Sequence, residues 1–343
     1  MTLFITGAAG FIGSSFLRVA KKNNLFSKIV ILDALTYAGR LENIEQIVND
    51  KDVIFEKVDI RDFETVANLF NKYTPHAVAH FAAESHVDNS ISGPRIFVET
   101  NVLGTLNLLE ASRSVFQKGN EDFQKKFRFL HVSTDEVFGQ LGDTGFFNEK
   151  TAYEPSSPYS SSKAASDHLV RAWQHTYKLP TIVTNCSNNY GPRQFPEKLI
   201  PRIILNCLSE KALPVYGQGL NIRDWIYVDD HSEGVWLALT KGTIGDTYCL
   251  GGNSERKNID VVKTICKILD RKRPRKSGES YEKLITFVED RKGHDFRYAI
   301  DDSHAIKTLG YTRRFKTFED GLESTINWYL ENSWRNHGAN PEI

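Results

Sequence analysis

Two adjacent acids, Asp135 and Glu136, follow an apolar run in the stretch FRFLHVSTDEVFG. Neighbouring side chains point to opposite faces of a strand, and in a helix they diverge by about 100°. The two carboxyl groups therefore meet different surroundings, and burial and nearby charges can separate their pKa values. One group could then donate a proton while the other removes one. The alternative is a solvated helix start, where acids interact favourably with the helix dipole.

A second pair with chemical potential is the tyrosine and lysine of YSSSK, Tyr159 and Lys163. In a helix these side chains lie one turn apart on the same face, so the ammonium can lower the pKa of the phenol. Tyr159 would then be a usable base. The alternative is an ordinary pair on a helix surface.

The elements that must position these residues alternate along the first half of the chain. Short β-rich runs predict buried parallel strands at 3–6, 29–33, 53–60, 77–83, 127–133 and 181–186. Between them, periodic patterns predict helices at 12–23, 62–73, 97–116 and 160–177. This order predicts an α/β fold, a Rossmann-type doubly wound parallel sheet with right-handed crossovers.

The alternation of strands and helices loosens from about residue 190, where Gly, Pro and basic residues gather. We therefore expect two domains. Residues 1–189 would form a dinucleotide-binding domain that also carries the catalytic residues. Residues 190–343 would form a smaller, mainly substrate-binding domain, with some segments returning to the first.

A glycine-rich turn follows the first predicted strand in TGAAGFIG, with glycines at Gly7, Gly10 and Gly13. This spacing suits a tight turn, close approach of backbone to a pyrophosphate, and a helix N-terminus that faces negative charge. Asp33 ends the next strand, where a carboxylate can accept both hydroxyls of an adenosine ribose. Such an acid would repel a 2′-phosphate, so the pattern favours NAD over NADP, although Arg40 nearby leaves NADP open.

Composition excludes several other classes of protein. The 343 residues include 43 basic and 43 acidic side chains, so the net charge gives no argument for binding nucleic acid or a membrane surface. Four scattered cysteines suggest neither a disulfide framework nor a metal site. The chain shows no basic leader before a long apolar stretch and no membrane span. We therefore expect a cytoplasmic protein.

The glycine turn followed by YSSSK resembles the extended short-chain dehydrogenase/reductase family over nearly the whole chain. More specifically, six blocks in order resemble the dTDP-glucose 4,6-dehydratase family: AAESHVDNSI, STDEVFG, YSSSKAASDHLV, NCSNNYGPRQFPEKLIP, GQGLNIRDWIYVDDH and DRKGHDFRYAID. The glycine turn departs from the family's usual GGAG by carrying Ala8, whose methyl is tolerable only if its φ is negative.

The resemblance implies a lyase that uses NAD without net oxidation and forms dTDP-4-keto-6-deoxyglucose and water from dTDP-glucose. Tyr159 would take the proton of the 4-hydroxyl while NAD accepts hydride from carbon 4. Glu136 would remove the proton of carbon 5, and Asp135 would protonate the departing 6-hydroxyl before hydride returns to carbon 6. Thr134 would hydrogen-bond the 4-hydroxyl, and Lys163 would orient the cofactor.

The same resemblance extends to further binding positions. With the glycine turn, Asp33, Tyr159 and Lys163, the expected NAD contacts are Phe11, Ile12, Asp59, Ile60, Ala82, Ala83, Thr100 and Asn189. With Thr134, the expected nucleotide-sugar contacts are Ser85, Asn188, Lys198, Leu199, Tyr216, Arg223, Asn258, Arg291 and His294, in which the arginines face the diphosphate.

Several of these positions have simpler explanations. Asp59 could cap the helix that follows, Asn188 could be a turn residue, and His294 an ordinary loop histidine. Arg223 could pair with Asp224 on the surface.

Competing functions also stay open. A UDP-glucose 4,6-dehydratase would use the same acids. A nucleotide-sugar 4-epimerase would leave the acids without a role, and a scaffold that only binds NAD would leave the whole catalytic set without one. The family further implies a homodimer, for which the helices at 97–116 and 160–177 could supply the interface.

Overall fold

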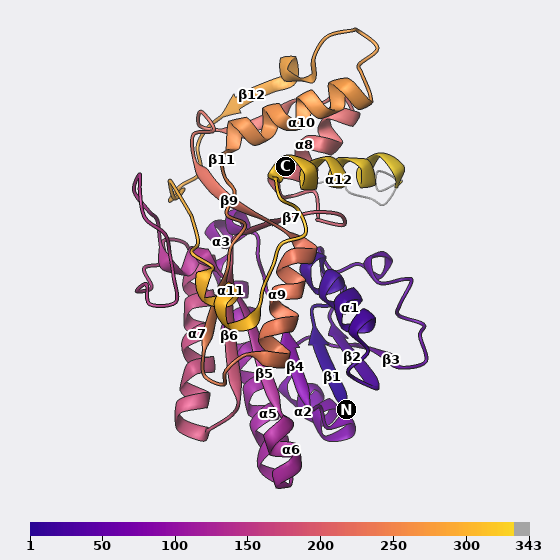
Figure 1. Cartoon of the computed structure of the whole chain (residues 1–343), viewed down its shortest axis with the longest axis vertical. Coiled ribbons are helices and arrows are strands. Elements are labelled where there is room, and N and C mark those ends of the chain that lie inside the picture. Colours follow the sequence, from indigo (N-terminus) through magenta and orange to yellow (C-terminus); the bar gives the residue numbers. More distant parts are fainter. Residues whose placement is uncertain (333–343) are drawn as a thin grey trace.

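The computed structural model describes residues 1–332, and its larger part is built on a seven-stranded parallel sheet (Figure 1). The strand order is β10-β6-β5-β4-β1-β2-β3, and every neighbouring pair is parallel. The strands are β1 (Thr2–Thr6), β2 (Lys28–Asp33), β3 (Val53–Lys57), β4 (Ala77–His80), β5 (Arg128–Thr134), β6 (Thr181–Cys186) and β10 (Thr247–Leu250). The prediction of a Rossmann-type α/β fold is confirmed.

All six predicted strands form, but two end earlier than predicted. β3 ends at Lys57 and β4 at His80, each three residues before the predicted end. The residues that follow, 58–60 and 81–83, line a cleft at the carboxyl ends of the strands. The chain leaves the sheet at these residues but stays apolar, so its composition does not indicate where the strands end.

Helices cover both faces of the sheet. On one face, α1 (Phe11–Asn23) packs against α9 (Val228–Lys241), and α11 (Ser303–Leu309) packs against α9 and β10. The other face carries α2 (Phe63–Tyr73), α5 (Thr105–Lys118) and α7 (Pro158–Tyr177), with short α6 (Glu121–Lys126) after α5. Elements of the second half of the chain, β10, α9 and α11, thus complete the large sheet and its layer.

The predicted single helix at 97–116 is wrong in one respect, because it is not uniformly α-helical. After α3 (Val87–Ser92) and α4 (Pro94–Phe97), a π-helical segment, η2 (Val98–Gly104), precedes α5. Within it the buried amide of Asn101 accepts from the Glu84 N–H at 2.8 Å and donates to the Glu84 carbonyl at 3.0 Å. This contact joins the helix to the loop after β4, and hydrophobic periodicity cannot predict such a local change of helix type.

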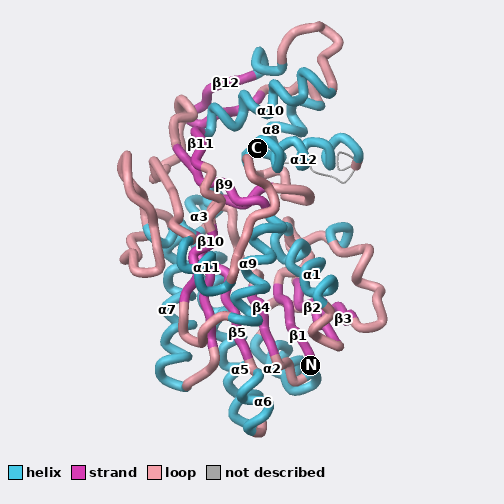
Figure 2. The backbone as a smooth tube through the Cα atoms, in the orientation of Figure 1, coloured by secondary structure: helices cyan, strands magenta, loops and turns pink. Residues whose placement is uncertain are grey.

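The smaller part lies beside the carboxyl ends of the large sheet, and in Figure 2 its strands are magenta and its helices cyan. One sheet has the order β11-β9-β7, formed by β7 (Asn188–Tyr190), β9 (Ile222–Tyr227) and β11 (Glu255–Lys257). β8 (Leu213–Tyr216) pairs with β12 (Ile285–Val288). The helices are α8 (Leu199–Leu208), α10 (Asn258–Lys272) and α12 (Phe318–Glu331), with the single-turn 3₁₀ helix η4 (Tyr281–Leu284). The 3₁₀ helices η1 (Leu41–Asn43) and η3 (Asp135–Phe138) belong to the larger part. Residues 333–343 of the predicted second domain lie outside the described residues.

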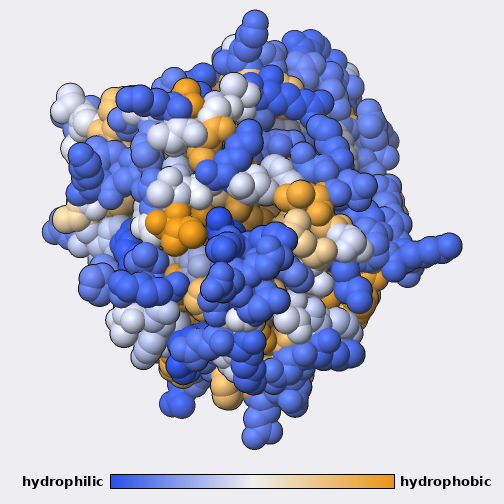
Figure 3. All heavy atoms as spheres, turned by 60° about the horizontal axis from the view of Figure 1, so that its bottom comes forward, coloured by the Kyte–Doolittle hydropathy of each residue, from blue (hydrophilic) through white to orange (hydrophobic). Residues whose placement is uncertain are grey.

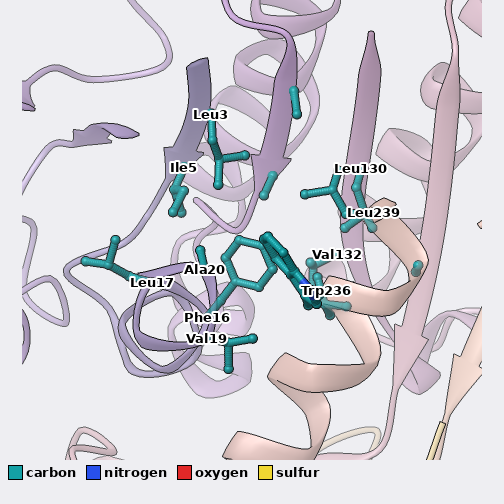
Figure 4. Close-up of a cluster of buried hydrophobic side chains, with 14 of the residues drawn as sticks. Leu3, Ile5, Phe16, Leu17, Val19, Ala20, Leu130, Val132, Trp236 and Leu239 are labelled. Atoms are coloured by element: carbon teal, nitrogen blue, oxygen red, sulfur yellow. The ribbon is translucent and has the colours of Figure 1, made fainter. Parts of the chain in front are cut away.

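Separate apolar clusters stabilise the two parts. Figure 4 shows the cluster between the sheet, α1 and α9, where the rings of Phe16 and Trp236 lie 6.2 Å apart. Another cluster joins α8, α10 and α12 in the smaller part. On the face seen in Figure 3, hydrophobic residues form separate groups between hydrophilic ones. Within residues 1–332, no helix has the length and apolar character needed to cross a bilayer.

Candidate active site

A continuous cleft lies at the carboxyl ends of β1, β2, β4, β5 and β6, where doubly wound sheets bind their ligands. It is lined by all the residues predicted to contact the cofactor, by the whole predicted catalytic set, and by four of the predicted substrate contacts. These four are Ser85, Thr134, Asn188 and Lys198.

The glycine turn forms one end of the cleft and leaves no room for a side chain at Gly7 or Gly13. Gly7 has a φ of +70°, and a Cβ there would lie 2.7 Å from the backbone nitrogen of Ala82. A Cβ on Gly13 would lie 2.1 Å from the carbonyl oxygen of Gly7. Gly10 precedes the first turn of α1. Ala8 is buried and does not have a positive φ, so its methyl fits the turn. The turn fits a pyrophosphate at the N-terminus of α1.

Asp33, at the end of β2, is held by both neighbouring loops. Its Oδ2 accepts from the Ala9 N–H and its Oδ1 from the Leu35 N–H, both at 2.9 Å. Burial raises the pKa of this carboxyl, while the two backbone hydrogen bonds oppose the shift. Each carboxylate oxygen keeps a further lone pair, so the group still fits two ribose hydroxyls.

Asp59 lines the cleft and does not cap the next helix. Its carboxylate pairs with Arg61 at 2.6 Å, whereas the cap of α2 is Asp62, which accepts from the Thr65 N–H. The capping explanation for Asp59 is therefore wrong. Ile60 lies beside it and packs against Gly104 of η2.

The two adjacent acids stand where β5 ends and η3 begins. Asp135 is buried and Glu136 is half-buried. The Thr134 hydroxyl donates to Asp135 Oδ1 and accepts from the Glu136 N–H, both at 3.3 Å. The threonine thus fixes the start of the turn that sends the two carboxyl groups in different directions.

The surroundings of the two acids differ. Burial, with the charges of Glu136 and Asp224, raises the pKa of Asp135 well above its ordinary value. Burial also raises the pKa of Glu136, but the positive charges of Lys198, Arg223 and Arg291 oppose that shift. Asp135 is therefore the better proton donor and Glu136 the better base.

Tyr159 and Lys163 face the cleft from the first turns of α7. The helix starts two residues before its predicted start, because Ser157 and Ser160 form reciprocal capping hydrogen bonds of 3.1 and 3.0 Å. Lys163 donates to the Val132 carbonyl at 2.9 Å. Burial raises the pKa of Tyr159, and it lowers the pKa of Lys163 to about 8.

Of the other predicted substrate contacts, some form a second group at the rim, on the smaller part. The Tyr216 hydroxyl donates to Asp88 Oδ2 at 3.2 Å, and Arg291 pairs with Asp88 at 2.6 Å. His294 lies beside Tyr216 and bonds Asp290 at 2.7 Å. Asp88, which the sequence did not single out, thus holds two predicted substrate residues.

Arg223 is buried, and it does not pair with Asp224. Its guanidinium donates to the carbonyls of Ile222, Asp295 and Phe296 and lies over the ring of Tyr298. Asp224 points to the other face of β9, where it accepts from the Gly252 and Ser254 N–H groups. The surface-pair explanation for Arg223 is wrong.

The remaining predicted contacts lie at helix starts or in the cleft. Leu199, at the start of α8, packs against the core of the smaller part, and Asn258 is the first residue of α10. Asn188 lines the cleft, and its buried Oδ1 has no hydrogen-bond partner within the described chain. An unsatisfied acceptor at this position fits a donor from a ligand.

The cleft also contains residues that the sequence did not suggest. Cys186, Glu197 and Phe195 line it. Phe195 packs edge-on against Tyr37 of the loop after β2, with ring centroids 5.7 Å apart. These residues are hard to identify from the sequence, because each joins the site only through contacts between segments that are distant along the chain.

Comparison with known proteins identifies the family. Residues 4–325 match the family model described as GDP-mannose 4,6 dehydratase. The chain is 52% identical to dTDP-glucose 4,6-dehydratase from Neisseria gonorrhoeae, with 98% of each chain covered. It is 54% identical to the Escherichia coli enzyme of the same name, covering 97% of this chain and 94% of that enzyme.

A solved structure gives the same result. DesIV, a dTDP-glucose 4,6-dehydratase from Streptomyces venezuelae crystallised with NAD and TYD bound, is 40% identical with a TM-score of 0.87, covering 97% of this chain and 98% of that one. The chain therefore belongs to the nucleotide-sugar 4,6-dehydratases of the extended short-chain dehydrogenase/reductase family, and within them to the dTDP-glucose 4,6-dehydratases.

Proposed function

We infer that the chain dehydrates dTDP-glucose to dTDP-4-keto-6-deoxyglucose and uses NAD as its cofactor. One observation carries this conclusion for the chain itself: Asp135 and Glu136 share a cleft with Tyr159 and Lys163 but lie in different electrostatic surroundings. An epimerase or a scaffold would have no use for such a pair. The relatives named dTDP-glucose 4,6-dehydratase favour dTDP-glucose over UDP-glucose.

The cofactor would lie along the glycine turn and β5. The turn and α1 would hold the pyrophosphate, with Gly7, Gly10, Phe11, Ile12 and Gly13 around it. Asp33 would bind the adenosine ribose, and Asp59 and Ile60 the adenine. When bound, NAD supplies a reversible acceptor for the hydrogen of a carbinol carbon. Near the middle of the cleft, its remaining contacts would be Ala82, Ala83, Thr100, Tyr159, Lys163 and Asn189.

Tyr159 would take the proton of the sugar's 4-hydroxyl, which Thr134 positions. Burial raises the pKa of this phenol in the chain alone. The ammonium of Lys163 on the same helix face would counteract that effect, because a neighbouring positive charge favours the phenolate. Lys163 therefore has to be charged when the reaction begins.

The two acids would then eliminate water. With carbon 4 at the ketone level, the hydrogen of carbon 5 is acidic, and Glu136 removes it. Asp135, whose pKa is raised, carries a proton that it gives to the departing 6-hydroxyl. Carbon 6 would then regain the hydride first removed from carbon 4, and carbon 5 would regain a proton from Glu136, so carbon 6 ends as a methyl group and the substrate undergoes no net oxidation.

Positive charge at the rim suits the diphosphate of the substrate. Lys198, Arg223 and Arg291 all act on Glu136 electrostatically, so they lie around one end of the cleft. Lys198 also donates to the Ser85 carbonyl at 2.7 Å, which joins the two sides of the cleft. Arg291 would exchange its Asp88 partner for a phosphate oxygen. The other proposed substrate contacts are Asn188, Leu199, Tyr216, Asn258 and His294.

We further propose the two-domain division at residues 189 and 190, a homodimer and a cytoplasmic location. Most residues that line the cleft come from the first 189. Val98 and Leu103 on η2 are 49% and 48% exposed, which supports a partner on that helical face. All four cysteines are buried free thiols, which suits a reducing compartment.

The activity is tested by mixing the purified protein with dTDP-glucose or UDP-glucose and following the 4-keto-6-deoxy product by its absorbance in alkali. Product from dTDP-glucose alone is expected. Product mainly from UDP-glucose would contradict the proposed substrate. No product from either compound would contradict the proposed reaction.

A further inference from the structure

Behind Lys163, on the side away from the cleft, lies a group of buried polar residues that the proposed mechanism does not use. His131 of β5 and Asp167 of α7 are both fully buried. Tyr153 and Arg171 extend the group toward the surface. Buried polar groups are costly unless they are satisfied by partners, so this arrangement calls for an explanation.

The ammonium of Lys163 has defined partners on this inner side. Its Nζ donates to the Val132 carbonyl at 2.9 Å and lies 3.3 Å from His131 Nε2. An ammonium group has three protons to donate. One goes to the Val132 carbonyl, and a second can go to His131 Nε2 when that nitrogen carries no proton, which leaves at least one for the cleft that Lys163 lines.

The imidazole lies near both Lys163 and the carboxylate of Asp167, whose Oδ1 has no well-aligned hydrogen-bond partner among the described residues. His131 Nε2 lies 3.2 Å from Asp167 Oδ1. The other carboxylate oxygen accepts from the Tyr153 hydroxyl at 2.7 Å, and Arg171 donates to the same hydroxyl at 2.8 Å. Burial raises the pKa of Asp167, but His131 and the charge of Lys163 outweigh it and bring that pKa below its ordinary value.

Asp167 is the anion that faces Lys163 among the titratable groups around it. On β5, burial lowers the pKa of His131 to about 4, which leaves the imidazole neutral at pH 7. On β4, burial likewise lowers the pKa of His80. Burial raises the pKa values of Tyr159 on α7 and Cys186 on β6, so both are neutral in the chain alone.

The imidazole also keeps the carboxylate at a distance. Residues four apart in a helix are neighbours, so Asp167 could otherwise pair directly with Lys163. His131 Nε2 lies near both groups, and one ring nitrogen cannot accept from Lys163 and donate to Asp167 at once. The ammonium is thus stabilised by the negative charge without being drawn away from the cleft.

We propose that Asp167, whose negative charge acts across His131, is a positioning residue that keeps Lys163 charged and directed at the cofactor and Tyr159. The proposal rests on the proposed role of Lys163. Without the carboxylate, Lys163 would be a buried cation without a counter-charge and would lose its proton at a lower pH.

The test is the pH profile of kcat for Asp167→Asn, which removes the charge and keeps the shape. We expect the alkaline limb to move to lower pH by about one unit or more, the lower end of the effect of an opposite charge at this range. At lower pH the activity of Asp167→Asn should approach that of the wild type. Asp167→Glu keeps the negative charge, so its alkaline limb should move less. Asp302→Asn is the matched control, since Asp302 is a buried acid paired with Arg313 in a different region.

Tyr153→Phe gives a second, milder variant in case Asp167→Asn does not fold. It removes one hydrogen bond to the carboxylate, and we expect a smaller shift in the same direction. A fall in kcat that is equal at every pH, with the limb unmoved in both variants, would show that Asp167 is only structural.

Lys163→Met separates this proposal from the function on which it rests. If this variant loses about 100-fold or more in kcat while the limb of Asp167→Asn stays in place, the role of Asp167 alone is overturned. If Lys163→Met turns over like the wild type, the role of Lys163 is wrong and the proposal fails with it.

Discussion

The hydroxyl of Thr134 donates to Asp135 Oδ1 at 3.3 Å and, with its oxygen, accepts from the backbone of Glu136 at the same distance. One side chain therefore orients the proposed acid and the backbone of the proposed base. Changes at this turn should therefore affect elimination, and those at Thr134 itself should also affect hydride removal from carbon 4.

Asp135→Asn should prevent departure of the 6-hydroxyl, because the amide cannot supply a proton. The variant should still oxidise carbon 4 and exchange the carbon 5 hydrogen with solvent. We expect kcat for product to fall about 100-fold or more, with deuterium from D₂O appearing in recovered substrate. Loss of the exchange together with turnover would contradict the assignment of Asp135 as the acid.

Glu136→Gln should stop the reaction one step earlier. Substrate should reduce the bound NAD, seen as absorbance of NADH, but no deuterium should enter carbon 5. Full turnover by this variant would contradict the role of Glu136. The two variants thus distinguish the roles of the two acids, because deuterium should enter carbon 5 in Asp135→Asn but not in Glu136→Gln.

The raised pKa of Asp135 has a consequence for stability. An acid whose pKa is higher in the folded state contributes stability that is fully present below its unfolded pKa and is lost as pH rises through the folded pKa. Asp135→Asn should therefore melt at a higher temperature than the wild type at pH 8, by about 1 to 3 °C, with the difference shrinking toward about pH 4. Calorimetry at both pH values checks this. If Asp135→Asn melted at a lower temperature than the wild type at pH 8, the predicted direction of the effect would be wrong.

The glycine turn can be tested with a matched pair of substitutions. Gly13→Ala places a Cβ 2.1 Å from a backbone oxygen, and it should abolish NAD binding and reduce the free energy of unfolding by about 3 kcal/mol. At Gly142 an added Cβ meets nothing within 4 Å, so Gly142→Ala should change that free energy by less than about 1 kcal/mol. Denaturant unfolding and NAD titration measure both. Retention of NAD by the first variant would contradict the steric argument.

Local patterns were sufficient to predict some features. The glycine turn, Asp33 and the Tyr159–Lys163 pair each depend on residues close in sequence, and the structure brings all of them to one cleft. Asp88 could not be found this way, because its importance comes from Arg291, which is distant along the chain. The same holds for His131 and Asp167, which read as ordinary strand and helix residues until the fold brings them together behind Lys163.

The π-helical segment η2 makes this part of the chain sensitive to the deletion of a residue. Deleting one residue there would restore α-helical pairing and rotate the preceding turn by about 100° relative to α5. Phe97, whose ring lies 6.3 Å from that of Tyr159, would turn away from that tyrosine. Val98 and Leu103 are half-exposed on the face proposed for a partner, so they should accept other apolar side chains. A change of apolar side chain on this exposed face should therefore cost little activity, whereas deletion of a single residue in η2 should abolish it.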